Sequence, residues 1–371
     1  MVEETDVFVI GGGPAGLAAA IAARRKGFRV TVADGAEPPI DKACGEGLLP
    51  DTATALRELG VDIRGSDGFA LRGIRFVGTG SSVAAAFPGE VAGIGVKRPV
   101  LHQRLVDRAL SLGVSLRWRT PVTGIRRGGV IAGGELVRAR WMVGADGIGS
   151  RVRKWGGLDA GARARKRFAQ RRHYRVQPWS ESVEIYWGEH AQAYVTPVAE
   201  SEVGIVMISR EAGVGFTAME AEFPQLAKRL SAAQGITGAE RGAVTMTRRL
   251  PRVFEGHVVL IGDASGSVDA ITGEGLCLGF RQALALGDAL EAGDLRGYAA
   301  AHRRLSRQPA MIGRLMLLLD GRTRLRERAI RALASDAELF ARLLAIHAGV
   351  TSSVQEWASA GAMLGWRFVA A

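Results

Sequence analysis

The sequence predicts an α/β (α+β) chain, and three observations lead to that class. Short apolar runs that lead into glycine occur at residues 7–10, 141–143 and 258–261, as expected for buried parallel strands. Residues 182–210 alternate between apolar and polar positions in the manner of antiparallel strands. From residue 294 onward the pattern is helical. The 371 residues, 47% hydrophobic and 23% charged, provide for one large or two medium domains.

The first apolar run begins a complete nucleotide-binding unit, "DVFVIGGGPAGLAAAIAARRKGFRVTVAD", in which strand, glycine turn and helix lead to a second strand. Gly11 permits the turn, Gly13 allows a pyrophosphate to approach, and Gly16 allows the helix to pack closely on the strand. Asp34 ends the second strand, where its carboxylate can accept hydrogen bonds from ribose hydroxyls. The unit predicts a Rossmann-like domain whose turn binds the cofactor through Gly11, Gly13, Pro14, Ala15 and Gly16.

Two further glycine elements favour FAD over NAD as the cofactor. "VVLIGDASG" places a strand before Asp263, and a helix follows from about Gly275. Asp263 is positioned to bond a polyol chain, and the free N–H groups at the helix start face an electron-rich ring edge. "WMVGADGIGS" is a third strand that ends in a glycine-flanked aspartate. The FAD contacts predicted from the first of these elements are Gly262, Asp263, Gly273, Gly275 and Leu276.

These three motifs, in this order, resemble those of the flavoprotein monooxygenases of the para-hydroxybenzoate hydroxylase type, together with the geranylgeranyl reductases. The resemblance covers roughly residues 5–300. It implies that Asp263 contacts the ribityl chain and that Asp146 supports the cofactor and, in hydroxylases, NADPH docking. It also implies that an arginine before a helix contacts FAD, and "VKRPVLHQRLVDRAL" offers Arg98 for that role.

The resemblance further implies an FAD-binding domain with an inserted substrate domain. The FAD-binding domain is assigned to residues 1–75, 90–160 and 245–300, the substrate-binding β-sheet domain to 76–89 and 161–244, and a helical C-terminal region to 301–371. Residues 217–233 are predicted to form a single helix of the substrate domain. An aromatic group suggests an apolar or aromatic substrate pocket, although each member alone is compatible with packing inside the sheet: His173, Tyr174, Trp179, Tyr186, Trp187, His190 and Tyr194.

The segment "DKACGEGLLP" closely resembles the Cys-Gly-x-Gly segment of the geranylgeranyl reductases, including the prenyl-chain reductases that act on menaquinone. The resemblance implies that Cys44 and Gly45 lie against the flavin ring, and that Cys44 is a candidate catalytic proton donor. The alternative is that Cys44 fills a tight bend. The aromatic motif of those reductases is only partly reproduced, through Tyr194 and Pro197, which with Tyr186 are the predicted substrate contacts.

The predicted function is that of an FAD-dependent oxidoreductase, with NADPH or NADH as electron donor. We favour a monooxygenase that hydroxylates a lipophilic or aromatic small molecule of secondary metabolism, such as a polyketide or an isoprenoid, because the aromatic motif of the reductases is incomplete. The first alternative, supported by the segment around Cys44, is a geranylgeranyl-reductase-like enzyme that reduces isoprenoid double bonds. The second alternative is a non-catalytic, flavin-binding redox sensor.

The net charge of +12 does not by itself indicate nucleic-acid binding, and no nucleic-acid partner is predicted. The chain has no asparagine and only six lysines among 49 basic residues, a bias typical of arginine-favouring codons, and no recognition-helix motif accompanies the charge. The excess is concentrated in residues 151–175 and 301–331. The second segment contains an apolar run, 310–319, which is compatible with a packed helical cap or with peripheral contact to an anionic membrane.

The remaining features indicate a cytoplasmic protein that is at most membrane-associated. No window reaches the roughly 18 consecutive apolar residues of a membrane span, and the acidic N-terminus is unlike a secretory signal. Cys44 and Cys277 cannot form a disulfide framework, which fits a reducing cytosol. No cysteine–histidine cluster has zinc spacing, so no metal is predicted.

Overall fold

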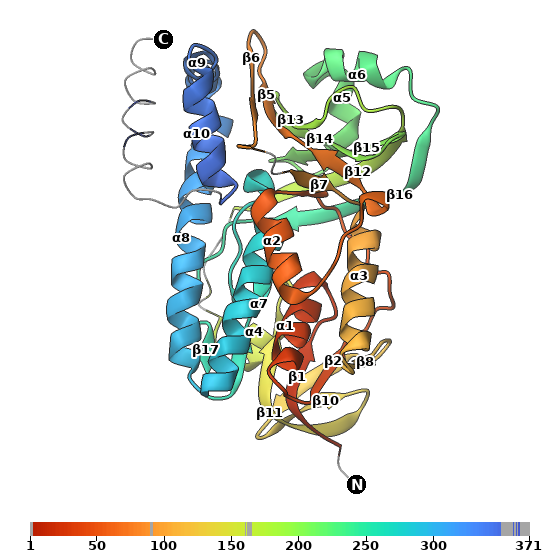
Figure 1. Cartoon of the computed structure of the whole chain (residues 1–371), viewed down its shortest axis with the longest axis vertical. Helices are drawn as coiled ribbons and strands as arrows, with labels where there is room; N and C mark the ends of the chain where they lie inside the picture. The colour runs from red at the N-terminus through yellow and green to blue at the C-terminus, as the bar shows by residue number, and fades with distance from the viewer. Residues whose placement is uncertain are drawn as a thin grey trace.

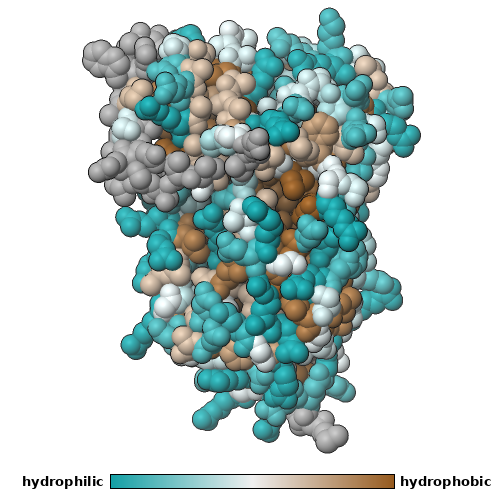
Figure 2. All heavy atoms as spheres, viewed as in Figure 1, coloured by the Kyte–Doolittle hydropathy of each residue, from teal (hydrophilic) through white to brown (hydrophobic). Residues whose placement is uncertain are grey.

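Two large β-sheets, one in each half of the molecule, organise the chain (Figure 1). The computed structural model describes residues 3–89, 92–159, 161, 165–349, 359, 361 and 363. The face in Figure 2 is mainly hydrophilic over the half that holds the first sheet, and hydrophobic residues gather between the two halves. This mixed architecture confirms the predicted α/β (α+β) class.

The first sheet is the predicted nucleotide-binding sheet and has eight strands. They are β1 (Glu4–Ile10), β2 (Val30–Ala33), β8 (Ser115–Arg117), β9 (Val122–Arg126), β10 (Gly129–Ala132), β11 (Glu135–Gly144), β17 (Phe254–Glu255) and β18 (Val258–Leu260). The order is β17-β18-β11-β1-β2-β8, and the run from β18 to β8 is parallel. The carboxyl ends of these parallel strands therefore meet at one edge of the sheet.

Both faces of this sheet are buried, which explains its uninterrupted apolar strands. Val7 and Val9 of β1 pack into one cluster with the helices, whereas Phe8 and Ile10 pack into a second cluster with β9 and β10. The helices of this half are α1 (Pro14–Arg25), α2 (Pro50–Leu59), α3 (Arg98–Ser111), α4 (Arg151–Trp155) and α7 (Gly275–Ala292). The alternation of β1 thus divides its side chains between the two layers.

The second sheet has seven strands in the order β16-β12-β15-β14-β13-β5-β6. Their bounds are β5 (Gly73–Val77), β6 (Ser82–Ala86), β12 (Arg167–Arg175), β13 (Ser182–Trp187), β14 (Ala191–Ala199), β15 (Glu202–Ser209) and β16 (Ile236–Thr245). Five of the six pairs are antiparallel. The pair of β13 with β5 is parallel, because these strands come from distant segments and no hairpin joins them.

A small third sheet lies between the two halves and carries the segment around Cys44. Its strands are β3 (Gly47–Leu48), β4 (Phe69–Leu71) and β7 (Gly93–Gly95), and the turn η1 (Gly65–Asp67) precedes β4. β7 packs closely on β14 of the second sheet, since the α-carbon of Gly95 faces the Pro197 carbonyl with no space for a side chain. This contact fixes the segment around Cys44 against the second sheet.

The predicted single helix over residues 217–233 is wrong. The segment forms η2 (Gly215–Ala218), α5 (Met219–Glu222) and α6 (Pro224–Leu230). The break lies at Phe223, whose φ of −138° and ψ of 61° are not helical. Pro224 causes it, because proline lacks an N–H and disfavours the helical conformation in the residue before it.

The C-terminal region is helical as far as the structure describes it continuously. It contains α8 (Leu295–Asp320), α9 (Thr323–Ala334) and α10 (Ala337–His347), and most of residues 350–371 lie outside the described residues. α8 runs along the first half, and α9 and α10 pack on β6 (Figure 1). Among the described helices, none combines the length and apolarity needed to cross a bilayer.

Candidate functional site

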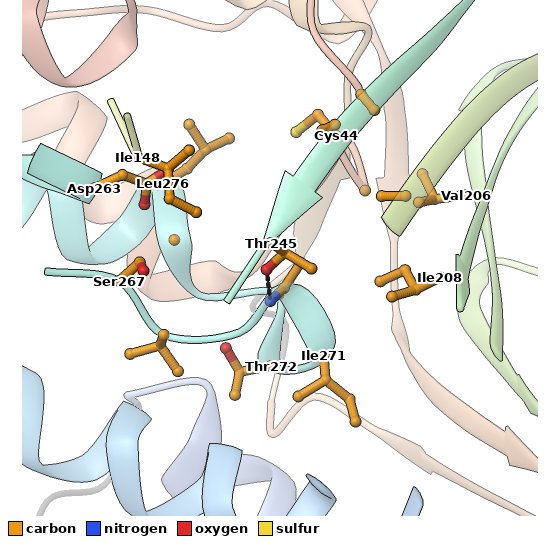
Figure 3. Close-up of a pocket in the computed structure, with 18 of the residues that line it drawn as sticks. Cys44, Ile148, Val206, Ile208, Thr245, Asp263, Ser267, Ile271, Thr272 and Leu276 are labelled. Atoms are coloured by element: carbon orange, nitrogen blue, oxygen red, sulfur yellow. Dashed lines mark hydrogen bonds between the residues drawn. The ribbon is translucent and has the colours of Figure 1, made fainter. Parts of the chain in front are cut away.

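A large cavity lies where the two sheets and the C-terminal helices meet. Its volume is about 1180 Å³, and its lining extends from the glycine turn after β1 to α10. In Figure 3, Asp263, Ile148 and Leu276 lie on one side and Val206 and Ile208 on the other. The first group belongs to the nucleotide-binding half and the second to the second sheet, so the cavity joins both halves.

The glycine turn after β1 forms one end of this cavity. Gly11 has φ +110°, and a Cβ there would lie 2.5 Å from the Ala145 carbonyl oxygen at the end of β11. A Cβ at Gly16 would overlap the Gly11 carbonyl oxygen. Gly13 has no heavy atom within 4 Å of its Cβ position, and it lines the cavity with Pro14 and Ala15 at the start of α1. The free N–H groups of this helix start can bind a phosphate.

Asp34 lies beside the turn at the end of β2. Its Oδ2 accepts a hydrogen bond from the Gly12 N–H at 2.7 Å, and its Oδ1 accepts one from the Ala36 N–H at 2.8 Å. Each oxygen retains a second lone pair that can accept from a ribose hydroxyl. On the other side of Gly12, His102 places Nε2 2.8 Å from the Gly12 carbonyl oxygen. Sequence reasoning missed His102, which supports the turn from α3.

Arg98 begins α3 and lines the cavity, as the resemblance implied. Its Nε is buried and has no hydrogen-bond partner among the described residues. A buried guanidinium nitrogen without an acceptor is costly unless an anionic group approaches it. Arg98 and the turn therefore fit the pyrophosphate of FAD.

The loop after β18 forms the next part of the cavity. Gly262 has φ +58°, and a Cβ there would lie 2.8 Å from the Ala15 Cβ. Asp263 lines the cavity, and no described residue forms a hydrogen bond with its carboxylate. The carboxylate is therefore available to a ligand hydroxyl. The loop contains η3 (Gly262–Ser265) and η4 (Ala270–Thr272), and the start of α7 adds Gly273, Gly275 and Leu276 to the lining.

Asp146 lines the cavity, but the chain already uses its side chain. The Ser150 hydroxyl donates to Oδ1 at 2.5 Å, and the N–H groups of Arg151 and Val152 donate to Oδ2 at 2.7 and 3.1 Å. The carboxylate thus caps the first turn of α4. Asp146 shapes the loop next to Gly11, and its part in NADPH docking stays a prediction.

Cys44 lines the cavity, and in Figure 3 it lies between the two groups of residues. The next polar residue, Glu46, was missed by sequence reasoning. Its side chain is 1% exposed and accepts hydrogen bonds from Arg171 Nη1 at 2.9 Å and from the Arg98 N–H at 2.9 Å. His173 Nε2 lies 2.6 Å from the other oxygen. Glu46 has φ +58°, and these bonds offset the cost of that left-handed conformation.

A second carboxylate, Asp41, completes this cluster. It accepts two hydrogen bonds from Arg171, both at 2.9 Å, and one from Arg241 Nε at 3.0 Å. Burial by itself would raise the pKa of Asp41, but the guanidinium groups of Arg171 and Arg241 outweigh it and lower that pKa. Asp41 and Glu46 therefore attach the loop that carries Cys44 to β12 and β16. In the sequence, the only signal for Glu46 was the presence of an acid between Gly45 and Gly47.

The opposite wall of the cavity is apolar. It is made by one face of the second sheet and by the C-terminal helices, with Ile74, Phe76, Val183, Ile185, Val206, Ile208, Ala243, Met316, Leu319, Leu333, Phe340 and Leu344. Three hydroxyl groups on this side of the cavity already form hydrogen bonds within the protein. Tyr194 donates to the Ile271 carbonyl at 2.8 Å, Thr196 donates to the Gly45 carbonyl at 2.7 Å, and Thr245 accepts from the Ala270 N–H at 2.8 Å. This wall fits a ligand without hydrogen-bonding groups.

Most of the predicted aromatic group does not reach the cavity. Tyr194 lines it, whereas Tyr186 and Pro197 do not. Tyr186 lies on the opposite face of the sheet, where its hydroxyl donates to Glu184 at 2.7 Å and its ring packs edge-on against Phe223. Adjacent strand residues point to opposite faces, so Tyr186 cannot share a face with Ile185. The substrate contact predicted for Tyr186 is therefore incompatible with its position.

Two titratable residues that sequence reasoning missed lie near the start of α7. His347 lines the cavity, and its Nδ1 is 3.7 Å from Glu274 Oε1. Burial, with the nearby Asp51 charge, raises the pKa of Glu274 to about 8, and burial lowers the pKa of His347. Both groups are therefore largely neutral near pH 7. No sequence pattern pairs them, because 73 positions separate them along the chain.

Residues 4–306 match the FAD binding domain family, and the chain belongs to that family. It is an FAD-dependent oxidoreductase. It is 27% identical over 331 residues to the menaquinone reductase of Mycolicibacterium smegmatis, covering 81% of this chain and 80% of that protein. It is also 27% identical over 325 residues to the digeranylgeranylglycerophospholipid reductase of Methanosarcina mazei, covering 81% and 76%.

Solved structures show the same fold. A flavoprotein/dehydrogenase from Cytophaga hutchinsonii has a TM-score of 0.80, with 19% identity over 94% of this chain and 93% of the other. The tetrameric 2-methyl-3-hydroxypyridine-5-carboxylic acid oxygenase has a TM-score of 0.73, with 23% identity over 94% and 96%. At these identities the likeness concerns the fold alone.

Proposed function

We propose that the protein is a reductase that saturates carbon–carbon double bonds in an isoprenoid chain. The observation that carries the proposal is the position of the segment from Cys44 to Gly47, which places Cys44 in the lining of the same cavity as the apolar wall. The similarity to reductases of menaquinone and of digeranylgeranylglycerophospholipid supports the same choice over the hydroxylase favoured by the motifs.

The cavity lining supplies the binding contacts for such a substrate. FAD, when bound and reduced by a nicotinamide donor, would supply hydride. The apolar face of the second sheet excludes water and holds an isoprenoid chain through dispersion contacts. The hydroxyl groups of Tyr194 and Thr196 donate their protons within the protein, which reduces the polarity that they present to the cavity.

Cys44 is the proposed proton donor. Its Sγ accepts a weak hydrogen bond from the Glu46 N–H at 3.5 Å, and no described residue accepts a hydrogen bond from the thiol. The hydride adds to one alkene carbon and the Cys44 proton to the other, so the double bond becomes a single bond. A nicotinamide donor, NADPH or NADH, replaces the two electrons, and solvent replaces the proton.

A hydroxylase is the second candidate, because the same dry compartment would suit it and an oxygenase shares the fold. The two reactions differ in their products. The flavoprotein is reduced anaerobically with NADPH, mixed with detergent-dispersed menaquinone that has an unsaturated side chain, and the quinone is analysed by mass spectrometry. After the ring has been reoxidised to the quinone, we expect the side chain to have gained two hydrogen atoms per turnover without oxygen. A gain of one oxygen atom, seen only in air, would support the hydroxylase instead.

The role of Cys44 is tested by comparing Cys44→Ser with Cys277→Ser. Both cysteines are free, but Cys277 is buried and donates to Asp51 at 3.0 Å. We expect Cys44→Ser to retain FAD and lose at least about a hundredfold in turnover, within the usual range for a lost general acid, while Cys277→Ser retains turnover. Equal activity of the two variants would assign Cys44 to packing. If the protein changes no quinone after reduction with NADPH or with dithionite, the result would favour the redox sensor.

A further inference from the structure

Helix α8 forms a wall of the cavity and also part of the outer surface. Ile312, Leu315, Met316, Leu318 and Leu319 all line the cavity. Leu315 and Leu318 are nevertheless 47% and 43% exposed to solvent. Side chains that line the cavity and are also exposed mark a place where the cavity reaches the surface.

The exposed apolar residues of α8 form one stripe. Met311 is 47% exposed and lies four residues before Leu315, which lies three residues before Leu318. This spacing places the three side chains on one face of the helix. The other large apolar residues that are equally exposed in the described structure, Leu110, Leu136 and Ile236, lie on three separate elements. The α8 stripe is therefore a concentrated patch.

Arginines surround the stripe. Arg307 and Arg314 lie on α8, Arg322 follows it and Arg324 lies in the first turn of α9, and all four are exposed. None of the four forms an ion pair with a described residue. The acids between residues 301 and 331 already have partners within the protein. Asp320 is buried against Arg210, and Glu327 accepts a hydrogen bond from the Thr79 N–H. The stripe therefore has a basic border without compensating acids.

We propose that this α8 stripe docks on an anionic lipid bilayer, and that the opening beside Leu315 and Leu318 admits the lipid chain directly from the membrane. Apolar side chains bordered by arginine fit a bilayer surface, because the side chains enter the acyl boundary while the guanidinium groups reach the phosphates. A nucleic acid would use the arginines but not the apolar stripe. The admission of substrate, unlike the docking, rests on the function proposed above.

The docking is tested by co-sedimentation of the full-length, FAD-loaded protein with vesicles. One set contains phosphatidylcholine alone, and the other contains phosphatidylcholine and phosphatidylglycerol in equal parts. We expect binding to the anionic set that weakens as salt is added, since screening reduces the attraction of the arginines. No binding to the anionic set, or equal binding to both sets at every salt concentration, would overturn the proposal.

A matched pair of variants locates the contact. Leu315→Glu with Leu318→Glu is compared with Leu110→Glu, which changes an apolar residue of α3 that is 55% exposed. The double variant should weaken vesicle binding at least about tenfold, because it removes two apolar contacts and adds repulsion. The Leu110 variant should bind like the parent, and FAD content and thermal midpoint check the folding of all proteins. Equal weakening in both would place the contact elsewhere.

The admission of substrate is tested separately. NADPH-reduced protein is mixed either with menaquinone embedded in anionic vesicles or with detergent-dispersed menaquinone, and saturation of the side chain is measured. Met311→Glu, which changes the stripe at a residue outside the cavity lining, should lose the reaction with vesicles about tenfold and retain it in detergent. Equal loss in both would overturn the role of the opening. Absence of reaction in detergent with the parent protein would contradict the proposed reductase, whereas the sedimentation result would still decide the docking.

Discussion

The two halves of the cavity are built by different means. In the nucleotide-binding half, short motifs at strand ends create the site through backbone geometry, as the positive φ angles of Gly11 and Gly262 show. In the substrate half, the apolar wall collects side chains from Ile74 to Leu344, and each contributes little more than apolar surface. The first half is therefore suited to one cofactor. The second half selects a class of ligand by the shape of the cavity and by the exclusion of water from its apolar wall.

The junction of the two halves should be the most sensitive point. Glu46→Gln removes a carboxylate that is a buried partner of both Arg171 and His173. We expect the free energy of unfolding, measured in urea, to fall by about 3 kcal/mol. Glu240→Gln is the control, because its pair with Arg172 is partly exposed and contributes about 1 kcal/mol or less. Equal losses would mean that the two halves are not joined through Glu46.

The backbone requirement of the first half is tested at Gly16. Gly16→Ala places a methyl group on the Gly11 carbonyl, so the turn must shift at a cost of about 2 kcal/mol and retain less FAD. Gly65→Ala is the control, since no heavy atom lies within 4 Å of its Cβ position. Flavin absorbance per protein after desalting measures the effect. A Gly16→Ala protein with full flavin content would show that the turn has more space than its geometry indicates.

The adenosine end depends on a side chain as well as on the backbone. Asp34→Ala removes the carboxylate that accepts from Gly12 and faces the ribose position, so we expect FAD to bind at least about tenfold more weakly while the fold remains intact. Asp288→Ala, which changes an exposed acid of α7, should leave binding unchanged. Titration of the apoprotein with FAD gives both constants. Unchanged affinity in Asp34→Ala would contradict the ribose assignment.

A pH-dependent effect is expected from Glu274, at the start of α7. Burial, with the Asp51 charge, raises the pKa of Glu274 from 4.5 to about 8, so the folded state binds a proton that the unfolded state has lost between those values. The unfolding free energy should therefore fall as pH rises through this window and level off above it. We expect a decrease of a few kcal/mol across this window, because each pKa unit of difference corresponds to about 1.4 kcal/mol. Thermal midpoints across pH should show a shallower decline in Glu274→Gln, and parallel curves would exclude Glu274 as the cause.

The cofactor site could be predicted in detail from the sequence. Gly11, Asp34 and Asp263 act within a few residues of the strands that carry them, and Arg98 was placed by the resemblance. The substrate contacts could not be predicted equally well. Tyr186 and Tyr194 look alike as sequence, but the register of β13 against β14 sends only Tyr194 toward the cavity. Glu46 was missed because its partners, Arg171 and His173, come from a distant strand.

The sequence by itself determined the FAD-binding half, because strand ends and glycine spacing are local properties that fix backbone shape. The resemblance also singled out the segment around Cys44, which lines the cavity. Only the tertiary structure decided which residues share the cavity, that Glu46 and Asp41 attach the Cys44 segment to the second sheet, and that α8 both lines the cavity and reaches the surface. These features depend on contacts between distant segments, and burial and electrostatic attraction act only after those segments have met.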